Sequence, residues 1–214
     1  MIEKAENYVR SIMSGDSSGH DWFHVLRVKN LAMTIAAEEQ KKGPVNLELV
    51  ALIALLHDVD DRKLSPETHE NLDRARGFLR SQNLAPDKTE IVLESIRNLS
   101  FKGTGESVPA SIEGKIVQDA DRLDAMGAIG IGRAFAFGGS RGREMYDPSQ
   151  PPQRNMDSET YAKSQGHTIN HFYEKLLLLK DLMNTDTGKA MAAHRHGFME
   201  SFLEEFYGEW EGII

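Results

Sequence analysis

Apolar residues recur every three or four positions along most of the chain, and this spacing predicts helices. One run carries Val25, Val28, Ala32, Ile35 and Ala36 and ends at Gly43-Pro44. The same spacing predicts helices over 65–79, 85–98, 112–126, 161–183 and 187–210. No run alternates between apolar and polar residues as a half-buried strand does. The pattern therefore predicts an all-α protein.

The helical pattern gives way at residues 137–159 to a segment rich in Gly, Pro, Arg and Ser, FGGSRGREMYDPSQPPQRNMDSE. Its length favours a functional or mobile loop over a simple connector. There is no internal repeat and no linker between halves. We therefore expect a single domain over residues 1–214, with the C-terminal helices at about 157–210.

The most apolar stretch, VALIALLHDVDD at residues 50–61, ends in an unusual group of polar residues. Every side chain from Val50 to Leu56 is apolar, which predicts a helix buried on all sides. At its C-terminal end, where the helix dipole disfavours negative charge, the chain places Asp58, Asp60 and Asp61. Crowded carboxylates repel one another and lose hydration, and a divalent cation relieves both penalties. His57 is the residue type that most often binds such an ion.

Composition limits the classes of function. The chain has 214 residues and no cysteine, which excludes thiolate zinc sites, iron–sulfur clusters and disulfides. A net charge of −8 argues against broad nucleic-acid binding, which depends on cationic contacts to phosphate. The N-terminus MIEKAENYVRSIM does not resemble a signal peptide, and the apolar core of residues 50–56 is too short to cross a membrane. We expect a soluble, cytoplasmic protein.

Two further residues complete a candidate metal site. His24, in DWFHVLRV, shares a helical face with Val28, and Asp121, in QDADRLDAMG, shares one with Val117. Two imidazoles and two carboxylates from three helices can hold a first-row divalent cation and leave positions for water and substrate. The alternative is that the histidines are hydrogen-bonded core residues and the acids merely end helices. Other paired histidines, His167 and His171, are read as surface residues.

The ordered set of D-x-x-H-x-x-R-V, a His-Asp pair ending an apolar helix, and A-D-R-L resembles the HD-domain metal-dependent phosphohydrolase superfamily. The resemblance covers about residues 20–135 by motif, and the C-terminal stretches are similar to those of small, uncharacterised bacterial HD hydrolases. It implies a helical HD-domain fold with a loop inserted before the C-terminal helices. It also implies that the metal ligands are His24, His57, Asp58 and Asp121.

The same resemblance implies a catalytic residue and a cofactor. Asp61 stands where alarmone hydrolases and bacterial nucleotidases of the superfamily carry a Glu that orients or deprotonates the attacking water. Manganese is the expected ion, although His and carboxylate ligands also admit magnesium, cobalt, nickel, iron or zinc.

The expected function is hydrolysis of a small phosphorylated metabolite, with a nucleotide as the class that the resemblance implies. Either a phosphomonoester or a pyrophosphate bond would be cleaved. Cationic side chains would stabilise the phosphoryl charge, and the candidates are Lys102, Arg122, Arg133, Arg141 and Arg143. A non-catalytic metal- and nucleotide-binding sensor of the same fold is the alternative. Hydrolysis of nucleic-acid ends is disfavoured by the charge, and a homodimer is left open.

Overall fold

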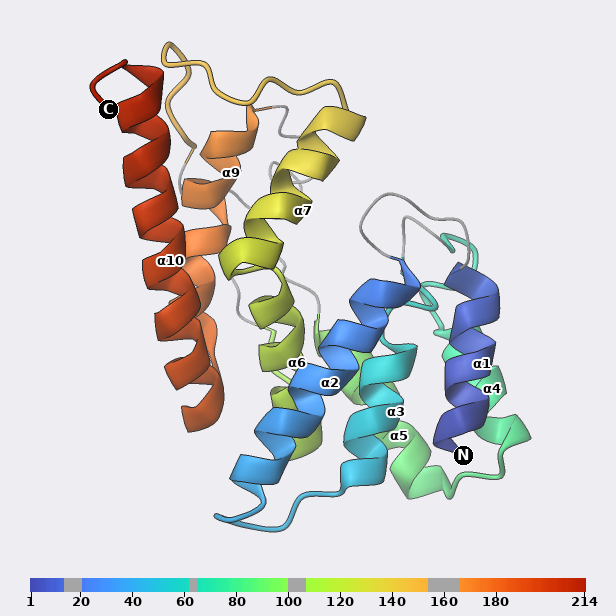
Figure 1. The fold of residues 1–214 in the computed structure, drawn as a ribbon. Helices are drawn as coiled ribbons and strands as arrows, with labels where there is room; N and C mark the ends of the chain where they lie inside the picture. The colour runs from blue at the N-terminus through green and yellow to red at the C-terminus, as the bar shows by residue number, and fades with distance from the viewer. Residues whose placement is uncertain (14–20, 62–64, 100–106, 154–165) are drawn as a thin grey trace. The chain divides into compact units, whose positions relative to one another are not determined.

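The computed structural model describes residues 1–13, 21–61, 65–99, 107–153 and 166–214. All regular structure in these residues is helical, as the apolar spacing predicts (Figure 1). The elements are α1 (Ile2–Met13), α2 (Trp22–Glu39), α3 (Leu47–Leu56), α4 (Asp73–Ser81), α5 (Pro86–Leu99), α6 (Ile112–Asp124), α7 (Gly127–Ser140), α9 (Thr168–Glu174), the 3₁₀ helix η1 (Leu176–Leu182) and α10 (Asp186–Trp210). In the part of the chain that is described, no helix is both long and apolar enough to span a bilayer.

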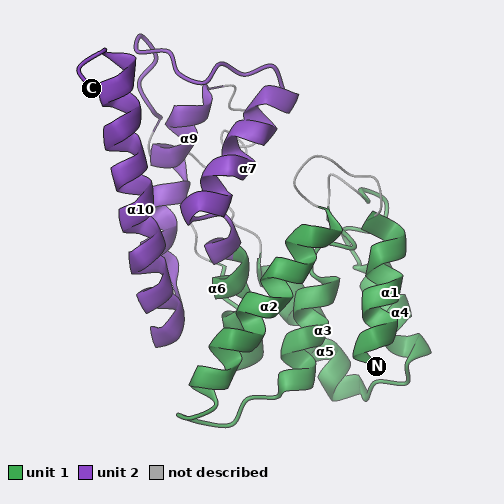
Figure 2. Ribbon diagram, viewed as in Figure 1, with its two compact units in different colours: residues 1–101, 106–121 green, residues 102–105, 122–214 purple. Residues whose placement is uncertain are grey.

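The chain folds into two compact units (Figure 2). The described residues of unit 1 lie within 1–121, and those of unit 2 lie within 122–214. The boundary falls inside α6, between Asp121 and Arg122.

Unit 1 is organised around α3, whose side chains from Leu49 to Leu56 are all buried. This helix contacts α1, α2 and α5, which explains why it has no polar face. Its start is set by Asn46, whose side chain accepts hydrogen bonds from the backbone N–H groups of Glu48 and Leu49. The backbone N–H of Asn46 in turn donates to the carboxylate of Glu113 at 2.8 Å, which ties the start of α3 to α6.

Unit 2 is held together by aromatic rings from α7, α9 and α10. The rings of Phe172 and Phe202 stack with centroids 5.8 Å apart, and Phe135 lies against both. The hydroxyl of Thr185 caps the first turn of α10 by accepting from the backbone N–H of Gly188 at 2.9 Å.

The helix expected over 65–79 begins later than its sequence suggests. Residues 66–72 form turns, and α4 starts only at Asp73. Leu72 has φ 55, in the left-handed region, so a helix cannot run through it. Proline at a first helical position is a common start signal, but here Pro66 opens a series of turns instead.

Three expectations for the C-terminal half also need correction. The helix expected over 161–183 is broken at Lys175 (φ −143) into α9 and η1, and residues 161–165 lie outside the described residues. The loop expected over 137–159 begins later, since α7 runs to Ser140. His167 is buried rather than on the surface, because its ring caps α9 and accepts from the backbone N–H of Asn170.

Two glycines of α7 provide a matched test of close packing. A Cβ on Gly130 would overlap the carbonyl of Ala125, whereas a Cβ on Gly132 would have nothing within 4 Å. We predict that Gly130→Ala lowers the free energy of unfolding by about 1–3 kcal/mol. Gly132→Ala should raise it by about 0.5–1 kcal/mol, because alanine loses less backbone entropy in a helix. Urea denaturation of both variants measures this, and shifts of the same sign would contradict the packing described here.

Candidate metal centre

His24 is supplied by α2. Asp21 caps this helix, and its carboxylate accepts from the backbone N–H of His24 at 2.8 Å. Because His24 lies on the same face as the buried Val28 and Ala32, its ring points into unit 1 and is only 1% exposed.

His57 and Asp58 follow directly after the buried helix α3. The Nδ1 atom of His57 lies 2.8 Å from the carbonyl oxygen of Ala54. A carbonyl only accepts hydrogen bonds, so Nδ1 carries the proton and donates it. When the ring is neutral, its Nε2 atom then keeps the lone pair that binds metals.

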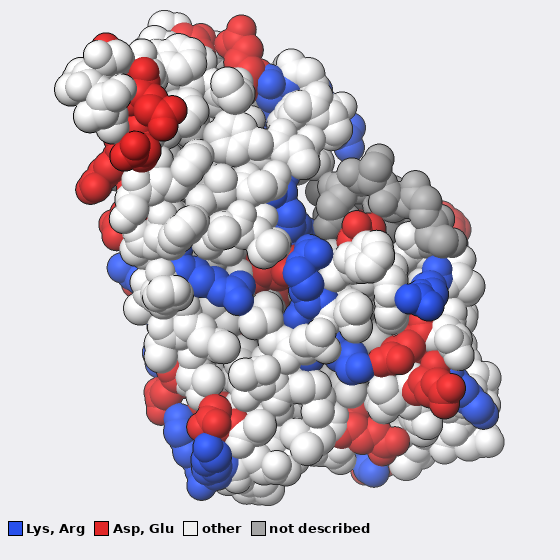
Figure 3. Space-filling model, in the orientation of Figure 1, with Lys and Arg blue, Asp and Glu red and all other residues white. Residues whose placement is uncertain are grey.

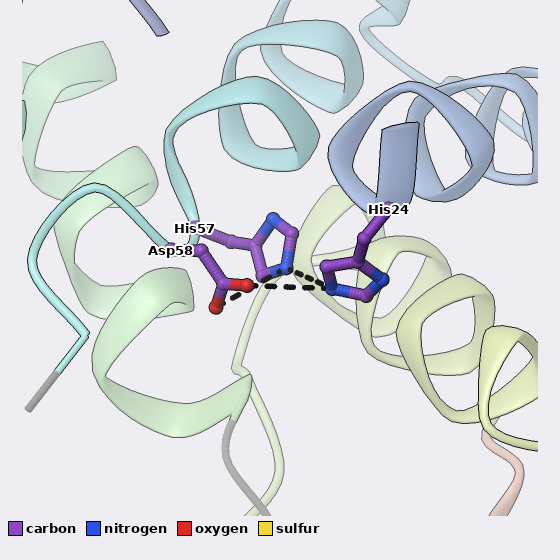
Figure 4. Close-up of side chains that lie close together, drawn as sticks. All are labelled: His24, His57 and Asp58. Atoms are coloured by element: carbon purple, nitrogen blue, oxygen red, sulfur yellow. Dashed lines mark hydrogen bonds and ion pairs between the residues drawn. The ribbon is translucent and has the colours of Figure 1, made fainter. Parts of the chain in front are cut away.

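The side chains of His24, His57 and Asp58 converge on one point (Figure 4). The two Nε2 atoms are 3.2 Å apart. The carboxylate oxygens of Asp58 lie 3.3 Å from Nε2 of His24 and 3.4 Å from Nε2 of His57. Asp121 approaches from α6, with Oδ1 at 3.5 Å from His24 and 4.0 Å from His57.

These separations are close to the distances between atoms that bind the same metal ion. Ligand atoms on a divalent ion with bonds of 2.0–2.1 Å lie roughly 3.0–3.4 Å apart, depending on the coordination geometry. Three buried donors and the half-exposed carboxylate of Asp121 come close to this spacing. Imidazole nitrogens and carboxylate oxygens are also the donor types that first-row divalent cations bind together. The residues therefore fit a divalent cation chemically as well as geometrically.

The acidic residues that follow Asp58 have different environments. Asp60 is buried, and its two carboxylate oxygens accept from the backbone N–H groups of Arg74 and Ala75 in α4. The N-terminus of α4 therefore compensates the charge of Asp60, which needs no metal ion. This corrects the expectation from the sequence that Asp58, Asp60 and Asp61 are crowded together in the same way. Asp61 is half-buried, and its backbone N–H donates to the carbonyl of Asp58 at 3.1 Å.

The cationic candidates are not equivalent. Arg122 is buried, and its guanidinium donates to the carbonyl of Leu182. Arg133 forms an ion pair of 2.7 Å with the buried carboxylate of Asp124. Arg141 and Arg143, at the end of α7, lie over the ring of Phe137 at 5.4 and 5.6 Å. Lys102 lies outside the described residues.

Charge on the visible face is mixed (Figure 3). Lys and Arg side chains are interspersed with Asp and Glu there, and acidic side chains gather near the C-terminal end of α10, which carries Glu204, Glu205 and Glu209.

Comparison with known proteins places the chain in a family. The family model for the HD domain matches residues 22–126, a range that includes all four candidate ligands. The uncharacterised protein YpgQ of Bacillus subtilis is 39% identical over 99% of this chain and 94% of its own length. The chain belongs to the HD-domain family. Its membership confirms the resemblance inferred from the order of the histidine and aspartate motifs.

Solved structures agree with this assignment to the HD-domain family. A Lactobacillus plantarum protein matches with a TM-score of 0.86 and 40% identity, covering 99% of this chain and 97% of its own. An HD-superfamily hydrolase from Bacillus thuringiensis matches with a TM-score of 0.76 and 42% identity, over 98% and 96%. Bacillus subtilis YpgQ, solved in complex with ADP, matches with a TM-score of 0.77 and 35% identity over the full length of both chains.

Removing one imidazole tests whether the cluster binds metal. Adding Mn²⁺ at about 100 times its Kd should stabilise the wild-type protein by about 2.7 kcal/mol, seen as a rise in Tm. We predict that His57→Ala abolishes this rise, because it removes a buried candidate ligand. His194→Ala, which removes an exposed histidine of α10, should leave the rise unchanged. An equal Mn²⁺ response in both variants would rule out His57 as a ligand.

Proposed function

We propose that this HD-domain protein is a divalent-metal-dependent phosphohydrolase that acts on a small phosphorylated metabolite, with a nucleotide as the proposed substrate class. The observation that carries the proposal is the approach of two buried Nε2 atoms, 3.2 Å apart, beside the carboxylate of Asp58. Similarity to HD-superfamily hydrolases supports the reaction class.

The proposed ligands are His24, His57, Asp58 and Asp121. The two carboxylates balance the charge of a divalent ion, so the loaded centre would be neutral and able to accept an anionic phosphoryl group. When bound, the ion would polarise a phosphoryl oxygen and lower the pKa of water. The hydrogen bond from His57 Nδ1 to Ala54 orients one imidazole for this task in advance.

Asp61 is the proposed catalytic carboxylate. It lies three residues after Asp58 on the same turn, and a backbone hydrogen bond joins the two residues. A carboxylate in that position can orient a water molecule and accept its proton. In this proposal Asp61 acts on the nucleophile, while Asp58 holds the ion.

The nucleotide preference is supported by the relative that was solved with ADP. Arg141 is exposed and Arg143 half-exposed, so of the described cationic candidates they are the ones we propose to bind phosphate oxygens. Arg122 and Arg133 already bind a carbonyl and a carboxylate, and their proposed effect on substrate is correspondingly smaller. Manganese remains the proposed ion.

A substrate panel tests the proposal directly. Nucleoside mono-, di- and triphosphates and alarmones are incubated with the protein and Mn²⁺, and released phosphate is measured separately from released pyrophosphate. The expected result is metal-dependent turnover of at least one nucleotide class, which the chelator EDTA abolishes. Tight nucleotide binding without any product would instead identify a sensor.

The role of Asp61 is tested by a substitution that removes only its charge. We predict that Asp61→Asn retains the Mn²⁺-induced rise in Tm but lowers kcat at least tenfold, because the amide cannot accept a proton from water. Asp87→Asn is the matched control, since Asp87 is an exposed carboxylate in the first turn of α5. If Asp61→Asn turned over substrate at the wild-type rate, the carboxylate would have no part in the chemistry.

A further inference from the structure

We propose that Asp60 is a positioning residue for the metal centre: it fixes the turn that carries Asp58 and Asp61 by capping α4. This inference rests on the proposed function, because it assigns a role within the same site.

The carboxylate of Asp60 accepts hydrogen bonds from two backbone N–H groups in the first turn of α4. Oδ1 accepts from the backbone N–H of Arg74 at 3.1 Å, and Oδ2 accepts from that of Ala75 at 2.9 Å. These are the second and third residues of α4, which are the donors that a capping side chain normally satisfies. The side chain is buried, with the residue 1% exposed, so water does not replace these bonds readily.

α4 has no local cap of its own. The residue before it, Leu72, is left-handed, and its side chain cannot accept a hydrogen bond. Asp60, which is 14 residues away from Arg74, supplies what the local sequence lacks. Its negative charge also lies at the positive end of the helix dipole.

A second contact holds the backbone of the same residue. The Nδ1 atom of His69 lies 2.9 Å from the carbonyl oxygen of Asp60, and the ring donates this hydrogen bond. Both the side chain and the main chain of Asp60 are therefore attached to the segment that leads into α4.

Because of its position in the sequence, the attachment of Asp60 to α4 also limits the movement of the proposed metal ligand. Asp60 stands between the proposed ligand Asp58 and the proposed catalytic Asp61, and successive Cα atoms are about 3.8 Å apart. A carboxylate ligand must be held within a fraction of an ångström of its place to bind well. Anchoring the residue between them limits how far either carboxylate can drift.

If the cap of α4 strengthens ion binding, ion binding must also strengthen the cap. The factor by which the cap raises the affinity for the ion equals the factor by which the bound ion raises the equilibrium constant for capping. Adding Mn²⁺ should therefore slow hydrogen exchange at the backbone amides of Arg74 and Ala75.

The test compares Asp60→Asn and His69→Ala with Thr185→Ala. Thr185 is a buried cap of α10, so its loss lowers Tm without touching the turn that carries Asp58. We expect Asp60→Asn to weaken Mn²⁺ binding at least tenfold, by analogy with other residues that orient ligands. His69→Ala, which removes an exposed side chain, should weaken it by a smaller factor. Thr185→Ala should bind Mn²⁺ within twofold of the wild type despite its lower Tm.

The outcomes separate this inference from the proposed function. Wild-type Mn²⁺ affinity in both Asp60→Asn and His69→Ala would overturn the positioning role and leave the metal centre intact. Failure of the wild-type protein to bind Mn²⁺ would overturn both. If Asp60→Asn did not fold, the affinity of His69→Ala and the metal-dependent exchange of the Arg74 and Ala75 amides in the wild type would decide the question.

Discussion

The candidate metal site depends on one constraint, the meeting of two imidazoles and two carboxylates at a largely buried point of unit 1. The two Nε2 atoms lie 3.2 Å apart, and they lie 3.3–4.0 Å from the carboxylate oxygens. A cation among these atoms would offset the hydration that the carboxylates lose and the repulsion between them. The all-apolar α3 anchors His57 in the core. The hydrogen bond to Ala54 then fixes the orientation of that ring.

The features of this site that depend on the local spacing of apolar residues can be predicted from the sequence. The run from Val50 to Leu56 has no polar residue, so the pattern predicts its burial, and it also predicts the face of α2 that carries His24. Family membership rests on the spacing of the same motifs and is confirmed by the HD-domain match over residues 22–126. The ligand assignment and the roles of Asp61 and of the arginines remain proposals, and the geometry of His24, His57 and Asp58 supports the first of them.

The parts that cannot be predicted depend on contacts between residues far apart in the sequence. The start of α4 is set by Asp60 from 14 residues away, so the local signal at Pro66 is misleading. Arg122, beside a proposed ligand, is expected at the substrate but donates to the carbonyl of Leu182, 60 residues away. The prediction of a surface position for His167 is wrong because nothing in its own helical pattern indicates that its ring caps α9. In each case a polar side chain satisfies a backbone group through a contact that no periodicity records.

The central claim is that these four side chains form one metal site, and anomalous diffraction from a Mn²⁺-soaked crystal tests it most directly. A single manganese peak is expected within about 2.0–2.3 Å of both Nε2 atoms and of an oxygen from each of Asp58 and Asp121. The account would be contradicted if a fully soaked crystal showed no manganese peak at this point, or if the ion were bound by other residues.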